Sequence, residues 1–502
     1  MMRVVKPLFP IVILLVTLQA VWAQDLSLVR VGLLFDVSSC AISCDSGLVL
    51  RTDAGNQRLP SSFAARPAAD GIDLGGVRVS APALTVHPAD GQGPLRLNGR
   101  EYRGDLVLIR GGDGLTVVNY VDIDAYIMGV LAGEVPASWP DETLRAQAVA
   151  ARSYALNKMA MRTDAQWDVV ATDRDQVYEG VQGEVPAIIR AVQATRGEVL
   201  TWQGQVVKAY FSASCGGHTE DVAVAFGENN APFLKGVKDP YCANSPYQQW
   251  GQTYTVAELR RILSRSGASI GPVLAVHASK RSGSGRVEEF TVVHSGGRQV
   301  LPGVELRRLL GYRELRSTRF DIAVTRSIPV TFTTTRDEWK KLQKTEVYHV
   351  PESIEVGMEE TNPVNHTVKP EDSFYVISAS GNLEKNRAGY AFAATDAGLM
   401  RTFAMRPGLS VLGVERDVVV TQLTVRRRKE RTTAREVKEI KKEIHVKKMP
   451  VVLKFTGRGW GHGVGLCQWG ARGMGAQGFD YREILAHYYP GTQIKNVRSM
   501  GR

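Results

Sequence analysis

The sequence lacks the long apolar stretches that a membrane protein needs. After the first 23 residues, no run reaches the roughly 20 apolar residues of a transmembrane helix. Cysteine is scarce, with five among 502 residues, and this odd number leaves at least one thiol over even when the others pair. The hydrophobic fraction of 44% is ordinary for a globular protein. The chain can therefore bury real cores in two or three domains, or in one large domain with an insertion.

A nucleotide-binding signature is also missing from the glycine-rich stretch near the C-terminus. Its alternating glycines do not have the spacing G-x-G-x-x-G, and no P-loop Lys-Ser/Thr pair follows them; they are Gly457, Gly459, Gly461, Gly463 and Gly465. Alternate glycines instead let the backbone approach another chain segment or a flat sugar ring closely. His462 is presented there, with Gln468 just beyond it. A structural role and a substrate-facing role are both open for His462.

The N-terminus has the pattern of an export signal. Arg3 and Lys6 precede an apolar run from Leu8 to Leu18, and Ala23 offers a small residue for signal-peptidase cleavage. We expect residues 1–23 to be a signal peptide, and the mature chain to be exported to the periplasm or cell-wall space with no stable membrane span. The net charge of +11 falls to +9 when the two basic signal residues leave. A basic exported protein suits anionic cell-wall polymers or lipid headgroups, and export argues against nucleic acid as a partner.

Residues 119–156 predict two helices joined by a short break. Asp122 or Asp124 can cap the first helix, Gly133 ends it, and Pro136 prevents its continuation. Ser138 then offers a cap for a second, alanine-rich helix. The break is therefore expected to form a short, stiff elbow between two packed helices.

Glu134 is the carboxylate on this elbow, with apolar Val135 and Trp139 beside it. An apolar surrounding disfavours the charged form of a carboxyl group and raises its pKa. A carboxylic acid that stays protonated near neutral pH can donate its proton to a glycosidic oxygen. We therefore expect Glu134 to be a general acid.

Two long motifs carry a resemblance to a known family. The stretch GVLAGEVPASWPDETLRAQAVAARSYAL and the C-terminal stretch GRGWGHGVGLCQWGARGMGAQGFDYREILAHYYPGTQI resemble the two signatures of the SpoIID/LytB family of bacterial peptidoglycan-acting proteins. The resemblance implies lytic transglycosylase activity on peptidoglycan glycan strands, with denuded strands as the substrate and Glu134 as the catalytic residue. It also implies an alternative, in which the chain is a non-catalytic enhancer of a cell-wall amidase or a wall-binding scaffold.

The predicted fold is α+β, with mixed β-rich lobes and a helix–elbow–helix core that forms a cleft. After the signal peptide, residues 24–118 read as a β-rich region, and residues 119–324 as a SpoIID-like core with the catalytic elbow. Residues 325–450 form an insertion that is atypical of the family, and residues 451–502 return to the core. The end of the insertion, residues 425–449, holds eleven Lys/Arg against four Glu. It is either the solvated face of a helix or long hairpin, or an arm that binds anionic polymer or membrane.

A turn after residue 211 presents residues typical of zinc ligands. Cys215 and His218 lie close in sequence, and Cys242 follows, so thiolate and imidazole could together bind a structural zinc ion. Some family members are similar in binding zinc near this turn, but this chain has Ser212 where relatives often place a His. A Cys215–Cys242 disulfide is the alternative, with His218 on the surface or facing substrate. No cofactor is required for the predicted reaction.

Five further residues are candidates for substrate binding: Arg152, Tyr154, Ser214, His462 and Gln468. For Arg152 an ordinary ion pair is an equal alternative.

Hydrolysis of a glycosidic bond normally uses two carboxylates, and no second one is tied to Glu134 by sequence. A lytic transglycosylase needs a single residue that acts as acid and then as base. Glu184 precedes Val185-Pro186 as Glu134 precedes Val135-Pro136, and it serves as the natural control. A zinc hydrolase centred on the turn lacks a nearby acid/base and ranks last.

Overall fold

The computed structural model describes residues 28–500, except 53–54 and 295–296, and between 336 and 441 it describes only short strands. The predicted signal peptide and residues 425–441 of the basic segment lie outside the described residues. The chain divides into two compact units. The first contains the described residues up to Ser212, together with Pro232–Leu234 and the segment from Gly465 onward; the second contains Ala213–Ala231 and Lys235–Val464.

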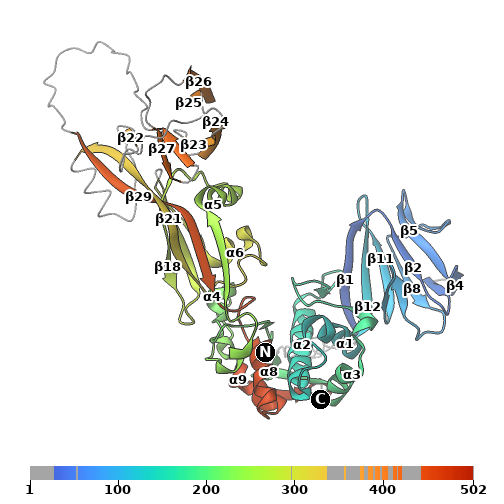
Figure 1. Cartoon of the computed structure of the whole chain (residues 1–502). Coiled ribbons are helices and arrows are strands. Elements are labelled where there is room, and N and C mark those ends of the chain that lie inside the picture. The colour runs from blue at the N-terminus through green and yellow to red at the C-terminus, as the bar shows by residue number, and fades with distance from the viewer. Residues whose placement is uncertain are drawn as a thin grey trace, which may run out of the picture. The chain divides into compact units, whose positions relative to one another are not determined.

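The first unit begins with two antiparallel layers of strands, blue in Figure 1. In order across the first sheet lie β13 (Val169–Val170), β1 (Leu28–Val37), β12 (Leu115–Asp122), β11 (Asp105–Arg110), β8 (Ala83–Pro88), β3 (Leu48–Thr52) and β4 (Gly55–Leu59), where only the β13–β1 pair is parallel. The second sheet has the order β10 (Arg100–Tyr102), β9 (Leu95–Leu97), β2 (Cys40–Ser43), β5 (Ser62–Ala68), β6 (Gly71–Leu74) and β7 (Val77–Val79).

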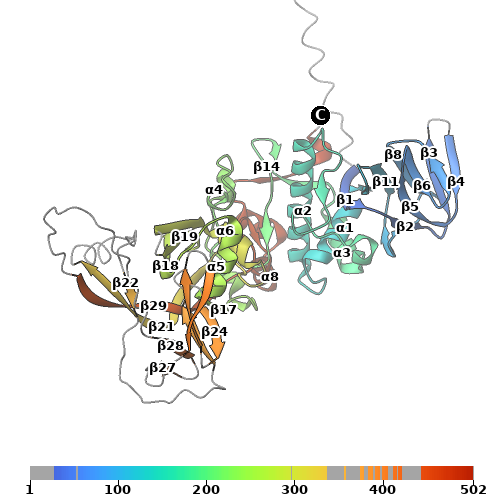
Figure 2. The same ribbon diagram turned by 90° about the horizontal axis from the view of Figure 1, so that it is seen from above.

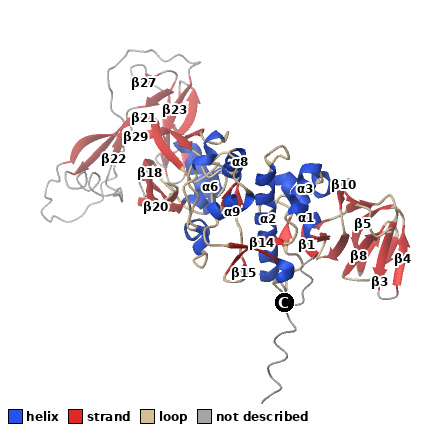
Figure 3. Cartoon of the chain, turned by 90° about the horizontal axis from the view of Figure 1, so that it is seen from below, coloured by secondary structure: helices blue, strands red, loops and turns tan. Residues whose placement is uncertain are grey.

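These strands form because their apolar residues alternate with polar ones, so each sheet has one face to bury. In β3, for example, Leu48 and Leu50 are buried and Arg51 is exposed. The buried faces of both sheets contribute to one apolar core, which also includes Val29, Ile42 and residues of the following helices. The predicted α+β class is confirmed, and the elements from β1 to β12 are all strands, as Figure 3 shows.

The helices of the first unit follow the sheets. They are α1 (Ile123–Glu134), α2 (Asp141–Met161), α3 (Pro186–Ala194), α8 (Gln468–Ala476) and α9 (Tyr481–Tyr488), with the 3₁₀ turns η1 (Gly180–Gly183), η2 (Pro232–Leu234) and η5 (Val497–Ser499). Figure 2 shows α1, α2 and α3 side by side. Two small sheets complete the unit: β15 (Gln205–Val206), β14 (Glu198–Trp202) and β31 (Gln493–Asn496), and the parallel pair β16 (Phe211–Ser212) with β30 (Leu466–Cys467).

The second unit is built on a four-stranded sheet and a three-stranded sheet. The four-stranded sheet has the order β17 (Trp250–Thr255), β29 (Lys442–Gly457), β21 (Phe320–Thr335) and β22 (Glu355–Gly357), and the other has β18 (Val273–Arg281), β19 (Val287–His294) and β20 (Gly297–Pro302). Its helices are α4 (Val222–Phe226), α5 (Val256–Leu263) and α6 (Gly303–Leu310), with η3 (Pro240–Asn244) and η4 (Ser264–Ser266). A separate apolar core includes Leu259, Phe290 and Phe455.

The predicted insertion, residues 325–450, includes most of β21, about half of β29 and the chain between them. β21 and β29 pair antiparallel from Phe320 opposite Gly457 to Thr335 opposite Lys442. Between them, three hairpins are described: β23 (Ser373–Ile377) with β24 (Leu383–Arg387), β25 (Tyr390–Thr395) with β26 (Gly398–Ala404), and β27 (Val411–Val414) with β28 (Asp417–Val420). Residues 442–449 of the basic segment are part of strand β29, so the helical alternative does not apply to them. None of the helices in the described part of the chain is both long and apolar enough to cross a membrane.

Candidate active site

Glu134 is the last residue of α1, where the sequence predicts the helix to stop. Asp122 caps the start of this helix by accepting hydrogen bonds from the amides of Asp124 (2.9 Å) and Ala125 (3.2 Å). The helix ends at Glu134 because Pro136 cannot continue it. The prediction that Ser138 caps the second helix is wrong: Pro140 occupies that position, without a side-chain cap, and its fixed φ suits the start of α2.

The Glu134 carboxyl group accepts two hydrogen bonds, one on each oxygen. The backbone amide of Val177 donates to Oε1 at 3.0 Å, and Nε2 of Gln468 donates to Oε2 at 3.2 Å. Gln468 is the first residue of α8 and is buried. Three separate parts of the sequence, near residues 134, 177 and 468, therefore meet at one carboxyl group within the first unit.

Apolar side chains line the elbow beside this group. Val135 and Trp139 are buried in a small cluster with Leu144 and Ala191, and Trp469 packs against it with its ring centroid 5.2 Å from that of Trp139. Glu134 itself remains partly exposed. A partly exposed carboxyl group with apolar neighbours is open to solvent at one side and poorly solvated at the other.

This environment shifts the acidity of Glu134 in the predicted direction. Burial raises the pKa of the Glu134 carboxyl above its ordinary value, the hydrogen bonds from Val177 and Gln468 lower it, and the negative charge of Asp173 raises it further. The net effect is an increase, and the expectation of a raised pKa is confirmed. A carboxyl group with a raised pKa keeps its proton to higher pH than an ordinary glutamate, which is the direction that a general acid needs.

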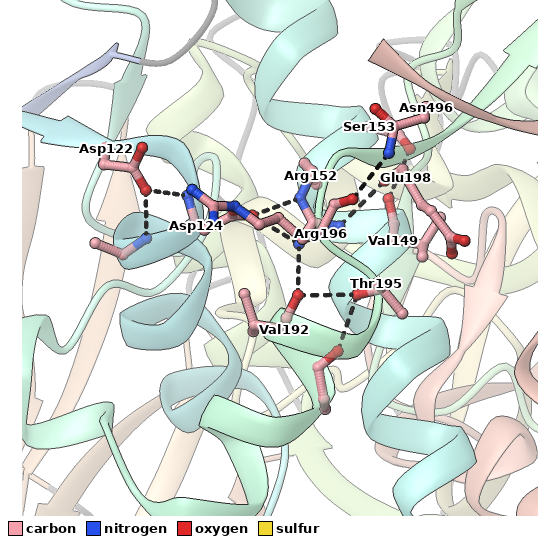
Figure 4. Close-up of polar contacts among 12 residues, drawn as sticks. Asp122, Asp124, Val149, Arg152, Ser153, Val192, Thr195, Arg196, Glu198 and Asn496 are labelled. Atoms are coloured by element: carbon pink, nitrogen blue, oxygen red, sulfur yellow. Dashed lines mark hydrogen bonds and ion pairs between the residues drawn. The ribbon is translucent and has the colours of Figure 1, made fainter. Parts of the chain in front are cut away.

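Arg152 has a structural environment, shown in Figure 4. It is fully buried, and Nε donates to Oδ1 of Asp124 at 3.0 Å. Its other nitrogens donate to the carbonyl oxygens of Glu198 (3.1 Å) and Val192 (3.3 Å). Arg196 pairs with the second oxygen of Asp124 at 3.2 Å. Arg152 thus connects α2 to α1, α3 and β14. This environment corresponds to the ordinary ion pair that the sequence allowed as the alternative to substrate binding.

The other candidate binding residues have different surroundings. Tyr154 is nearly buried, and its hydroxyl group donates to Oδ1 of Asp175 at 2.9 Å. Ser214 is fully buried in the second unit, where its backbone pairs with that of Trp460. His462, also in the second unit, is partly exposed, and its Nδ1 accepts a hydrogen bond from the amide of Val464 at 3.0 Å. Of the five candidates, the structure brings Gln468 to Glu134.

Glu184 differs from Glu134 in its surroundings, although both precede Val-Pro. Both of its oxygens accept hydrogen bonds from the Arg103 guanidinium, one of them at 2.5 Å. Both oxygens of Glu184 are therefore occupied by one ion pair, whereas the oxygens of Glu134 face a backbone amide and a side-chain amide. Glu184 remains suitable as a control for Glu134.

The cysteine-rich turn brings together a different donor set from the predicted one. The ligand atoms of Cys215, Asp239 and Cys242 lie within 4.8 Å of one another, and all three residues are buried. His218 is not in this group: its Nδ1 lies 2.6 Å from the carbonyl oxygen of Thr219. All five cysteines are present as buried thiols, with Sγ of Cys215 3.7 Å from Sγ of Cys242.

The spacing of these atoms fits a tetrahedral zinc site. Two thiolates bound at about 2.3 Å in a tetrahedron lie about 3.8 Å apart. The amide of Gly217 donates to Sγ of Cys215 at 3.4 Å, and Nε2 of Gln248 donates to Sγ of Cys242 at 3.3 Å. Such N–H donors stabilise negative sulfur and are typical of the surroundings of metal-bound thiolates.

Sequence reasoning missed the residues that approach Glu134 from the loop after β13. The Val177 amide and the Asp173 charge both act on this carboxyl group. The loop is polar and contains several ionisable residues, but nothing in its composition indicates which helix it returns to. A backbone amide also leaves no signature in a sequence.

The first unit therefore presents a carboxyl group with a raised pKa on a helix-to-helix elbow. Residues 111–202, which contain this elbow, match the family model SpoIID, described as Stage II sporulation protein. The part of the chain that holds the elbow is therefore similar to the SpoIID family, in line with the resemblance of its motifs.

Three curated relatives illustrate the similarity. An uncharacterised protein of Brachyspira hyodysenteriae is 35% identical over 216 residues, which are 43% of this chain and 55% of the relative. Stage II sporulation protein D of Bacillus subtilis is 31% identical over 161 residues, 29% of this chain and 47% of the relative. The amidase enhancer of Bacillus subtilis is 25% identical over 371 residues, 73% of this chain and 40% of the relative. The chain thus spans about half the length of these relatives.

Proposed function

We propose that this protein is an exported lytic transglycosylase that cleaves peptidoglycan glycan strands, with Glu134 as acid and then base. The observation that carries the proposal is the carboxyl group at the elbow, whose pKa is raised mainly by burial and whose two oxygens are each oriented by one donor. Similarity to the SpoIID family and to an amidase enhancer supports peptidoglycan as the substrate class.

The reaction uses one carboxyl group twice, first as an acid and then as a base. The Glu134 carboxylic acid gives its proton to the glycosidic oxygen while the bond from that oxygen to C1 of the sugar breaks. The resulting carboxylate accepts hydrogen bonds from Val177 and Gln468. It then takes the proton of the C6 hydroxyl group, whose oxygen bonds to C1 and closes a 1,6-anhydro ring. Glu134 ends protonated, and no water is consumed.

The two donors suit the second half of this reaction. A hydrogen bond to an ionised carboxylate is stronger than one to a neutral carboxyl group, so the donors stabilise the intermediate state in which Glu134 is charged. The apolar wall at Val135 and Trp139 favours the neutral state before the reaction. The two influences oppose each other, as a residue that must both lose and regain a proton requires.

Peptide-free sacculi incubated with the purified protein provide the test, with the products analysed by mass spectrometry. We expect 1,6-anhydro products from the native protein and none from Glu134→Gln. Glu184→Gln is the matched control, because it makes the same change in the same tripeptide context, outside the site, and it should retain activity. Equal loss in both variants, or anhydro products from Glu134→Gln, would contradict the assignment. Products with free reducing ends would instead identify a hydrolase.

A second function is favoured by one comparison. The amidase enhancer of Bacillus subtilis matches over 73% of this chain, more than the other relatives described above. The chain would then bind glycan strands and a cell-wall amidase without cleaving the strands itself. Glycan binding by the native protein without anhydro or reducing-end products, together with faster cleavage by an added amidase, would support this alternative.

A structural zinc ion is compatible with either function. Cys215, Asp239 and Cys242 would hold it, and bound zinc would cross-link the turn after β16 to η3. We assign it no part in the reaction.

A further inference from the structure

One of the two donors to Glu134 comes from the loop between β13 and η1, which we call the 172–177 segment. This segment supplies the Val177 amide, 3.0 Å from Oε1, and the exposed Asp173, whose charge acts on the same carboxyl group. A loop is the least rigid kind of element, yet a catalytic hydrogen bond needs a fixed position. The structure shows how this loop is held.

Gln176 ties the segment to both helices of the elbow. Its side chain is fully buried. The hydroxyl group of Tyr126 on α1 donates to Oε1 of Gln176 at 3.0 Å, and Nε2 of Gln176 donates to the carbonyl oxygen of Ala151 on α2 at 3.2 Å. An amide is suited to this place because it offers a donor and an acceptor at the same time.

Asp175 provides a second attachment to α2. Its Oδ1 accepts a hydrogen bond from the Tyr154 hydroxyl group at 2.9 Å and lies 2.7 Å from Nζ of Lys158. Its Oδ2 accepts a hydrogen bond from the amide of Val170 at 3.0 Å. Tyr154, a candidate for substrate binding, therefore acts on the segment that reaches Glu134.

Small residues on α1 allow the chain after Gln176 to lie directly on the helix. A Cβ atom at Gly133 would come within 2.8 Å of Cγ1 of Val177, and one at Gly129 within 2.5 Å of the Tyr178 ring. The amide of Glu179 donates to the carbonyl oxygen of Gly129 at 3.0 Å. The Val177 amide can reach the end of α1 because no side chains stand between the two backbones.

We propose that Gln176 is a positioning residue for Glu134: its buried amide fixes the 172–177 segment between α1 and α2 and so keeps the Val177 amide on Oε1. The proposal rests on the proposed function, in which Glu134 carries the proton. Gln176 does not touch the substrate in this scheme. It acts through the backbone of the next residue.

The direct test measures the protonation of Glu134 without relying on activity. The carboxyl carbon of Glu134 is followed by ¹³C NMR during a pH titration and is assigned by its loss in Glu134→Gln. Gln176→Leu removes both hydrogen bonds, and Tyr126→Phe removes the one to Oε1 of Gln176. The Val177 hydrogen bond lowers the pKa of Glu134, so both variants should titrate at higher pH than the native protein. Asp173 and Tyr126 are the ionisable groups whose fields couple to Glu134, and a neutral Tyr126 carries no charge that the variant would remove.

Asn157→Leu is the matched control. It removes a side-chain hydrogen bond from α2, to the carbonyl oxygen of Val206 at 2.8 Å, but does not touch the segment. Glu134 should titrate in this variant as in the native protein. An unchanged titration in folded Gln176→Leu and Tyr126→Phe would overturn the proposal. If Gln176→Leu does not fold, Tyr126→Phe decides alone.

Activity gives the second readout. The rate of anhydro-product formation should fall by about tenfold to a hundredfold in Gln176→Leu, as expected when a catalytic group is misplaced by a fraction of an ångström to about 1 Å. The alkaline limb of its pH profile should move to higher pH, which simple loss of folded protein would not cause. A lower rate with an unmoved limb would contradict the positioning role. If the native protein forms no anhydro product while the NMR titration still shifts, the proposed function fails and the positioning role stands.

Discussion

Replacing Arg152 by Met separates its structural role from contact with a substrate. The change keeps much of the buried aliphatic stem and removes the guanidinium group, which pairs with Asp124 and donates to the carbonyl oxygens of Val192 and Glu198. Asp124 would keep one partner, Arg196, whose side chain is 60% exposed and therefore a weaker substitute.

The expected loss of stability is large. Removing one member of a buried ion pair costs about 3–5 kcal/mol, because the other charge is left without full compensation. The remaining contact of Asp124 with Arg196 favours the lower end of this range, about 3 kcal/mol. A unit of this size loses about 2–4 °C in Tm per kcal/mol, so we expect Tm to fall by roughly 6–12 °C.

Thermal unfolding followed by circular dichroism measures this loss, and a cycle with Asp124→Asn isolates the pair. The coupling energy between the two positions should exceed about 1 kcal/mol, since the residues are in direct contact. At a temperature where the variant is folded, glycan binding should be unchanged. An unchanged Tm with weakened glycan binding would refute the structural assignment and return Arg152 to the substrate-binding residues.

Three further predictions follow from the site and the turn. In a pH–rate profile, activity should fall as pH rises through the raised pKa of Glu134, because the reaction starts from the protonated form. Asp173→Asn removes a charge that raises this pKa, so the alkaline limb of the profile should move to lower pH. An unmoved limb would count against the assigned influence of Asp173. Gly133→Ala should lower the free energy of unfolding, measured by chemical denaturation, by about 1–3 kcal/mol, because the added Cβ would clash with Val177. A Cβ at Gly112 meets no atom within 4 Å, so Gly112→Ala should change this free energy by less than about 0.5 kcal/mol. Equal effects would show that the close approach of Val177 to Gly133 is unimportant. Purified protein should contain zinc by elemental mass spectrometry and Cys242→Ser should contain much less, while zinc-free native protein would exclude the metal site.

Local signals in the sequence were sufficient for most of the helices. Helix α3 begins at Pro186, which suits a first helical turn, and Asp480 forms a capping box with Glu483 at the start of α9. These features depend on residues within one helical turn of each other, so they can be predicted from the local sequence. The Ser138 error belongs to the same class, because proline and serine both suit a helix start and their neighbours do not choose between them.

The active site was predictable only in part. Glu134, its apolar neighbours and the direction of its pKa shift follow from the residues around the elbow. The donors do not: the Val177 amide is 43 residues away in sequence and Gln468 is 334 residues away. In the candidate zinc site, Asp239 lies beside Cys215 and Cys242, where we predicted His218. Residue type alone favoured the imidazole, but the backbone places His218 Nδ1 next to the carbonyl oxygen of Thr219. Contacts over such separations are set by packing of the whole unit, which the local pattern does not encode.

The long ladder of β21 and β29 has a consequence for the engineering of this chain. Its last paired residues, Thr335 and Lys442, are partners in neighbouring strands, so the polypeptide leaves the ladder and returns to it at one place. The entropic cost of closing a connection between two fixed ends grows only slowly with the length of the connection. A foreign module grafted between Thr335 and Lys442 should therefore leave the paired ladder intact.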